Sequence, residues 1–236
     1  MLEQMPILIR IDDYKIERIL RGVQRTNNPA KENEGKRNLH WKELVHFSAC
    51  HCVNHVLTST AGKSLAETLE KANNRWWTNR HYKFHSNEHF LQVRHTVNAH
   101  LMSFLKDHVA SKPIILFEPS TVSIEELEME LSQNLHVVSI LGDSIQEGYI
   151  VQKFIVDESS ESLALYQHMT TVFGMGAFKR LPDRIEALSL LSGKKYVWTP
   201  NIEDWKQSLD YMRLVKSLLP SPCLTVDEFT TFRMIM

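Results

Sequence analysis

The sequence places a strong cation and a titratable imidazole six positions apart, at Arg94 and His100. At about 100° per residue of an α-helix, these two side chains stand about 120° apart around the helix axis. They then lie at opposite edges of one apolar stripe, which consists of Phe90, Val93, Val97, Leu101, Phe104 and Leu105. An imidazole can transfer protons, and a guanidinium can stabilise a developing negative charge. The alternative is that both residues flank a packed face, which Arg94 covers with its aliphatic stem.

The segment that contains this pair, from Arg94 to His100, reads RHTVNAH. It resembles the signature of HEPN-family ribonucleases, in which an arginine and a polar residue, here His95, precede a histidine after a short spacer. The resemblance implies an all-α domain that dimerises, so that two motifs share a cleft and cleave RNA without a metal ion. It also implies that His100 handles protons at the 2′-hydroxyl or the leaving oxygen and that Arg94 stabilises the charged phosphorane.

The same spacing occurs at Arg75 with His81 and at Arg80 with His85. What favours Arg94 and His100 is their position inside a strongly amphipathic helix, beside a stripe that could serve a dimer.

A second segment, from Asn73 to His85, alternates cations with aromatic rings in the order NNRWWTNRHYKFH. Cations that neutralise phosphates beside rings that stack on bases are what single-stranded nucleic acid binding requires. The residues that we predict to contact nucleic acid are Arg75, Trp76, Trp77, Arg80, Tyr82 and Lys83. The alternative is that the tryptophans fill the core at a helix junction while the cations lie in solvent.

Histidine and cysteine are concentrated in the stretch HFSACHCVNH, where His51 and His55 share one helix face. An i, i+4 pair of histidines can hold a metal ion, but the glutamate of an HExxH zinc-protease motif is missing. Cys50 and Cys52 would point away from each other on a helix. We therefore predict buried, hydrogen-bonded histidines, with no metal ion and no cofactor.

Composition indicates a soluble globular protein, because 43% of the 236 residues are hydrophobic and 23% are charged. We find no apolar run long enough to span a membrane and no signal-peptide pattern. The three cysteines are too few for a disulfide framework, so we expect a reducing, cytoplasmic setting. Residues 1–110 contain 16 Lys and Arg against 11 Asp and Glu, whereas residues 111–236 contain 11 against 17. The balance of +5 against −6 favours a polyanion-binding first half, or a charge-matched contact between halves or copies.

The first half, residues 1–110, is predicted to be a basic helical domain. Helices are expected from Asp12 or Asp13 to Gln24, from Trp41 to Leu57, from Leu65 to Ala72 and from Ser86 to Val109. Pro6–Ile11 is expected to form an edge strand or a hydrophobic arm. Thr26–Asn38 has almost no apolar residue and is expected to form a loop.

The second half, residues 111–236, is predicted to be an acidic α+β domain. Strands are expected at Ile114–Phe117, Leu135–Leu141, Tyr149–Val156 and Lys195–Thr199. Helices are expected at Ser123–Gln133, Ser159–Phe173 and Pro182–Gly193. This order is that of a ferredoxin-like βαββαβ unit. Further helices follow from Asn201 to Leu219 and from Thr225 onward.

Taken together, these features favour a protein that binds RNA or other single-stranded nucleic acid, with cleavage as the further expectation from the HEPN resemblance. A homo-oligomer is expected, since such a site would be shared. The rival hypothesis is a non-catalytic assembly protein. It would contact copies of itself or a protein partner through the apolar stripe, the Pro6–Ile11 arm and the apolar segment Thr225–Met236.

Overall fold

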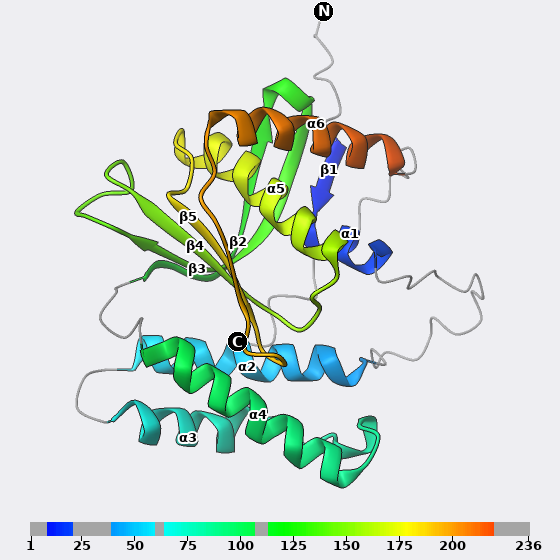
Figure 1. Ribbon diagram of the computed structural model, residues 1–236, viewed down its shortest axis with the longest axis vertical. Helices are drawn as coiled ribbons and strands as arrows, with labels where there is room; N and C mark the ends of the chain where they lie inside the picture. Colours follow the sequence, from blue (N-terminus) through cyan, green and yellow to red (C-terminus); the bar gives the residue numbers. More distant parts are fainter. Residues whose placement is uncertain (1–8, 21–38, 60–63, 107–112, 220–236) are drawn as a thin grey trace, which may run out of the picture.

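The computed structural model describes residues 9–20, 39–59, 64–106 and 113–219 of the chain. These residues form a mixed α and β structure, as predicted, in which a three-helix layer lies below a six-stranded sheet (Figure 1). The expected loop at Thr26–Asn38 and the expected helix from Thr225 lie outside the described residues, as do residues 6–8 of the predicted arm.

The three-helix layer consists of α2 (Trp41–Thr58), α3 (Leu65–Trp76) and α4 (Asn87–Lys106), with a short 3₁₀ turn η2 (His81–Lys83) before α4. The predictions of these helices are confirmed, with α3 four residues longer than expected. The side chains of His40 and Ser64 accept hydrogen bonds from the first turns of α2 and α3, respectively. The predicted stripe on α4 faces the core of this same chain, because Val93, Val97, Leu101 and Leu105 are buried there.

The segment nearest the amino end joins the sheet and not the three-helix layer. Strand β1 (Ile9–Asp12) pairs in parallel with the first residues of β3, and α1 (Asp13–Leu20) contacts α5. Ile9–Ile11 therefore forms an edge strand of the sheet, which is one of the two predicted alternatives. Although the sequence groups residues 9–20 with the basic half, they pack with the acidic half.

The sheet contains, besides β1, the strands β2 (Pro113–Ile124), β3 (Met129–Ile140), β4 (Tyr149–Ile155), β5 (Arg184–Ser189) and β6 (Lys195–Trp198). Its order is β1-β3-β4-β5-β6, and β2 pairs antiparallel with β3 over nearly its whole length. The neighbours β3 and β4 are antiparallel, as are β5 and β6, whereas β4 and β5 are parallel. A parallel pair requires a crossover, which α5 (Ser160–Phe178) supplies.

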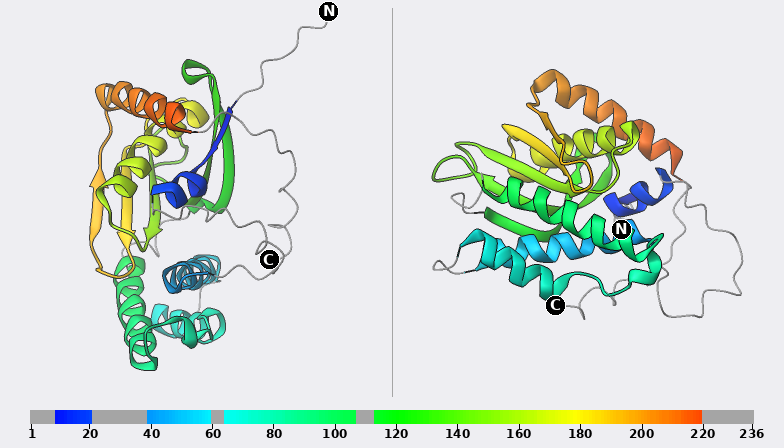
Figure 2. Two further views of the ribbon diagram at one scale, coloured as in Figure 1. Left: turned by 90° about the vertical axis from the view of Figure 1, so that its right-hand side faces the viewer. Right: turned by 60° about the horizontal axis from the view of Figure 1, so that its bottom comes forward.

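Different helices cover the two faces of the sheet. Phe154 and Leu188 are register partners and share a hydrophobic cluster with α2, α3 and α4. The partners Val151 and Ile185 lie three residues earlier on the same two strands. Since side chains alternate between faces, they point to the other face, where they pack with residues of α5. Figure 2 shows the same division from two further directions, with α2, α3 and α4 together at one end of the molecule.

The predicted helix at Ser123–Gln133 is wrong. Strand β2 continues to Ile124, the 3₁₀ turn η3 (Glu125–Leu127) follows, and β3 begins at Met129. Ser123 and Glu126 have the spacing of a capping box, but the segment also alternates buried Met129 and Leu131 with more exposed acidic residues. This two-residue period fits a strand, and pairing along β2 outweighs the local helix signal.

The predicted helix at Pro182–Gly193 is also wrong, since Arg184–Ser189 forms β5 between β4 and β6. Nearly every residue of this strand is buried, and pairing with β4 and β6 outweighs the helix-start signal of Pro182. Two of the expected elements thus change type, and the unit does not have the ferredoxin-like βαββαβ order.

Helix α5 runs past the glycine that was expected to end it and stops at Phe178. A Cβ atom at Gly174 would collide with the Tyr149 hydroxyl, and one at Gly176 would collide with Ile124. These glycines therefore allow close packing of α5 on the sheet. Helix α6 (Ile202–Leu218) closes the described chain, as predicted. None of the helices in the described ranges has the length and apolar character that a membrane crossing needs.

Candidate functional site

Arg94 and His100 are held by different parts of the molecule. Arg94 Nη2 donates a hydrogen bond of 2.8 Å to Asn74 Oδ1 at the end of α3. His100 Nδ1 lies 2.9 Å from the carbonyl oxygen of Leu190, which is in the turn after β5. Since a carbonyl oxygen only accepts, His100 donates this bond. These contacts give both side chains a positioning role between elements, and the structure does not bring the two together.

Trp76 forms an exposed aromatic platform at the end of α3. Its side chain is 38% exposed, and its ring stacks on His51 of α2 with centroids 4.9 Å apart and planes inclined by 15°. The Arg75 guanidinium lies 4.9 Å from the centroid of the same ring. Burial beside α3 lowers the pKa of His51, so its ring tends to be neutral. The His51 ring thus supports one face of the Trp76 indole.

Tyr82 is a second exposed ring, in η2. It is 69% exposed, and Lys83 Nζ lies 5.8 Å from its centroid. Arg80 is exposed immediately before this turn. We call Arg75, Trp76, Arg80, Tyr82 and Lys83 the ring-and-cation surface. Four of the six predicted nucleic-acid-binding residues are therefore exposed, and Lys83 is half-buried.

Trp77 is the exception and is withdrawn from the predicted interface. It is only 8% exposed and belongs to the hydrophobic cluster of the three-helix layer, as does Phe84. The next residue, Thr78, donates its backbone N–H to Ser48 of α2, which turns the chain at the end of α3. A tryptophan at this helix junction packs inward, which is the alternative that the sequence left open.

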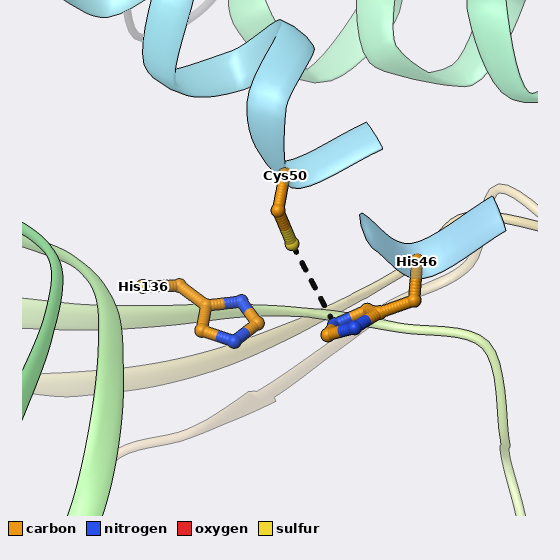
Figure 3. Close-up of side chains that lie close together, drawn as sticks. All are labelled: His46, Cys50 and His136. Atoms are coloured by element: carbon orange, nitrogen blue, oxygen red, sulfur yellow. Dashed lines mark hydrogen bonds between the residues drawn. The ribbon is translucent and has the colours of Figure 1, made fainter. Parts of the chain in front are cut away.

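A partly buried cluster of donor atoms lies elsewhere, between α2 and the sheet. His46 and Cys50 of α2 and His136 of β3 each offer one ligand atom, and these atoms all lie within 4.8 Å of one another. Figure 3 shows the Cys50 thiol pointing from α2 toward the space between the two imidazole rings. Cys50 Sγ lies 3.6 Å from His46 Nε2.

The backbone of Phe154 links the two imidazoles of this cluster. Its N–H donates to His136 Nδ1 at 3.1 Å, and its carbonyl oxygen lies 3.0 Å from His46 Nε2. Burial lowers the pKa of His136 well below its ordinary value, and the neighbouring His46 and Lys153 add to this effect. Burial also raises the pKa of the Cys50 thiol, against the opposing influence of Lys153. Both groups are therefore uncharged at neutral pH.

Beside this cluster lies a buried ion triad. Lys153 Nζ of β4 is 3.3 Å from Asp13 Oδ2 and 2.5 Å from Glu17 Oε1, both on α1. Burial acts to lower the pKa of Lys153, but the two carboxylates outweigh burial and the pKa is raised. Of the three groups, Lys153 acts electrostatically on Cys50 and His136, and its charge is paired with Asp13 and Glu17.

Two of the three residues of this cluster could have been found from the sequence. His46 and Cys50 are four residues apart on one helix, the same spacing that drew attention to His51 and His55. His51 and His55 do not belong to any three-residue ligand cluster within the described part of the chain. His136 lies far along the sequence, and only the packing of α2 against β3 brings it to the other two.

A comparison with protein-family models finds no match to this chain, and a comparison with curated proteins finds none either. The chemistry of both sites is therefore inferred from their residues and geometry.

Proposed function

We propose that this protein binds RNA or another single-stranded nucleic acid through the ring-and-cation surface. The observation that carries the proposal is that Trp76 and Tyr82 are both exposed and each lies beside a cation. Aromatic rings stack on bases of any sequence, and neighbouring cations neutralise phosphates. The mode of recognition is thus backbone tracking with base stacking.

The arginines of this surface support the proposal because they are available to a phosphate. Within the described ranges, neither Arg75 nor Arg80 forms an ion pair with a carboxylate. By contrast, Arg184 is 2.6 Å from Glu186 and Arg213 is 2.5 Å from Asp210. A surface guanidinium that has no carboxylate partner can bind a phosphate oxygen without first breaking an ion pair.

The proposal is limited to binding. Cleavage by Arg94 and His100 stays a separate prediction, since the bond of His100 to Leu190 and that of Arg94 to Asn74 account for both side chains as links between elements. The rival assembly hypothesis loses one of its surfaces, because the apolar stripe of α4 is buried in the core of the same chain.

The first test measures binding of a fluorescently labelled single-stranded RNA by anisotropy. Trp76→Ala and Tyr82→Ala should each weaken binding by about 1–3 kcal/mol, the value of one lost base stack. The matched control is Tyr14→Ala on α1, an exposed tyrosine that also has a lysine, Lys15, 5.9 Å from its ring. Equal affinity of wild type, Trp76→Ala and Tyr82→Ala would refute the proposal.

The second test uses salt. The logarithm of the affinity should fall linearly with the logarithm of the salt concentration, with a slope of about −0.7 per neutralised phosphate on a single strand. Arg75→Gln and Arg80→Gln should each reduce that slope, and Arg213→Gln, which removes an arginine already paired with Asp210, should not. A salt-independent affinity would point to an apolar partner surface instead.

A further inference from the structure

We propose that His46, Cys50 and His136 bind a transition-metal ion of the zinc class, which joins α2 to β3. The inference stands apart from the proposed function, because none of the three residues belongs to the ring-and-cation surface. It starts from three chemically suitable donor atoms within 4.8 Å of one another.

The donor set selects the class of ion. Two imidazole nitrogens and one thiolate sulfur suit Zn²⁺ and related first-row ions, whereas Mg²⁺ and Ca²⁺ require oxygen ligands. Because His46 and Cys50 are four residues apart on α2, one helical turn presents both donors on the same side. His136 supplies the third donor from the sheet. Three protein ligands leave the fourth position of a tetrahedral ion for water or another group.

The proton balance of binding is simple. Burial keeps both Cys50 and His136 uncharged, and neutral imidazole is the form that binds a metal ion. The thiol must ionise, so the ion forms a bond to Sγ as the S–H bond breaks and one proton leaves to solvent. The Phe154 N–H now occupies His136 Nδ1, and an ion that takes this nitrogen displaces that hydrogen bond. His46 Nε2 donates to the Phe154 carbonyl oxygen, so an ion that takes Nε2 breaks this bond too. The His46 proton then moves to Nδ1, and the net release stays at one proton.

The charge next to the cluster is that of Lys153. A divalent ion with one thiolate and two neutral imidazoles carries a net charge of +1, which is costly to bury alone. Lys153 acts to lower the pKa of both Cys50 and His136, so it favours the thiolate and the neutral imidazole that bind an ion. Its own positive charge repels a cation, and the ion pairs of Lys153 with Asp13 and Glu17 reduce that repulsion.

The experiment is a titration of the purified full chain with Co²⁺, a spectroscopic substitute for Zn²⁺. Cys223 is replaced by Ser in every protein compared, which leaves Cys50 and Cys52 as the only thiols. We expect one Co²⁺ per chain, the visible bands of a tetrahedral ion, a thiolate-to-cobalt charge-transfer band, and displacement of Co²⁺ by Zn²⁺. One proton per chain should be released.

The variants locate the site. Cys50→Ser should abolish the charge-transfer band, and His46→Gln and His136→Gln should lower the affinity for Co²⁺ by at least about 10-fold. Cys52→Ser and His51→Gln on the same helix are the matched controls and should bind as wild type does. Cys52 is buried with its thiol directed to Asn73 Oδ1, so its loss tests the specificity for Cys50.

Three results would overturn the proposal: no charge-transfer band in the wild type, a band that survives in Cys50→Ser, or a band that is lost in Cys52→Ser. If Cys50→Ser does not fold, as judged by circular dichroism, the thermal midpoint decides. A ligand that binds only the folded state raises the midpoint. Zn²⁺ should raise it in the wild type and in His51→Gln but not in His46→Gln, and an equal rise in all three would refute the site.

Discussion

His100 and Gly193 pack directly against each other where the three-helix layer meets the turn between β5 and β6. A Cβ atom at Gly193 would stand only 2.7 Å from His100 Nε2, and the glycine has a φ of +74°. The same imidazole is anchored by its bond to the Leu190 carbonyl in this turn. The histidine that sequence singled out for proton transfer is therefore part of the contact that docks α4 onto the sheet.

Gly193→Ala should destabilise the protein for two reasons, which a second variant separates. The positive φ costs about 1–3 kcal/mol for a residue with a Cβ atom, and the contact with His100 adds to this cost. In a His100→Ala background the contact is gone and only the backbone cost remains. We expect a coupling of about 0.5–3 kcal/mol between the two substitutions, measured by urea unfolding of the double-mutant cycle. Strict additivity would show that the two residues do not press on each other.

His100→Ala also decides between two roles for this histidine. The HEPN resemblance predicts that the protein cleaves RNA and that this variant loses cleavage with its fold intact. The contacts of His100 predict a loss of about 1–3 kcal/mol in the free energy of unfolding, because the Leu190 carbonyl loses its side-chain donor. Urea unfolding and an RNA cleavage assay on the same samples distinguish the two outcomes.

Trp76 and Trp77 are neighbours in sequence with opposite environments, and their alanine variants should differ accordingly. Trp77→Ala removes a ring from the core and should cost about 3–5 kcal/mol. Trp76→Ala loses the contacts with His51 and Arg75 at the surface and should cost about 1 kcal/mol or less. Urea unfolding of both variants measures the difference, and similar costs would contradict the assignment of Trp77 to the core.

The helices of the first half were predictable because their local signals agree with their packing. In α4 the apolar residues recur at helical spacing, and the four that are buried lie on one face of that helix. Ser64 and Glu67 form the capping box at the start of α3, in which the side chain of each accepts a hydrogen bond from the backbone N–H of the other. Where capping, periodicity and burial give the same answer, a single sequence is sufficient.

The second half was less predictable because long-range pairing decides its structure. Ser123 and Glu126 have the local chemistry of a helix start, yet Ile124 and Met129 are register partners across a hairpin. Arg184–Ser189 gains a neighbour strand on each side, which no local pattern reveals. The His/Cys cluster depends on the same long-range contacts, since His136 of β3 meets α2 only where that helix packs against the sheet. Trp76 and Trp77 likewise differ in exposure, and the sequence could not show which of the two tryptophans is buried.

Lys153→Met should be among the most destabilising substitutions in the sheet. It leaves Asp13 and Glu17 without the buried cation that both contact, and breaking a buried pair from one side typically costs about 3–5 kcal/mol. The matched control is Lys206→Met on α6, which removes an exposed lysine 2.9 Å from Glu203 and should cost less than about 1 kcal/mol. Chemical denaturation of both variants gives the comparison. A small cost at Lys153 would mean that water reaches the two carboxylates.

His136 should make the metal-free protein less stable as the pH falls below the ordinary pKa of histidine. Its pKa in the folded state is lowered by burial, with His46 and Lys153 adding to the effect. In the unfolded chain the ring binds a proton at about pH 6.5, whereas the folded protein excludes it. The unfolded state then holds more protons, so the free energy of unfolding falls with decreasing pH. This one group accounts for about 2 kcal/mol between pH 7.5 and 5.

The measurement is urea unfolding across that range, in the presence of a chelator and above the pH at which carboxylates protonate. His136→Gln keeps an oxygen that can accept the Phe154 N–H but removes the titrating group. The variant should be less stable than wild type at pH 7.5 and should lose less stability on acidification. His51 and His168 also have pKa values lowered by burial, so some pH dependence persists in the variant. Parallel pH profiles for the two proteins would mean that His136 is protonated in the folded state.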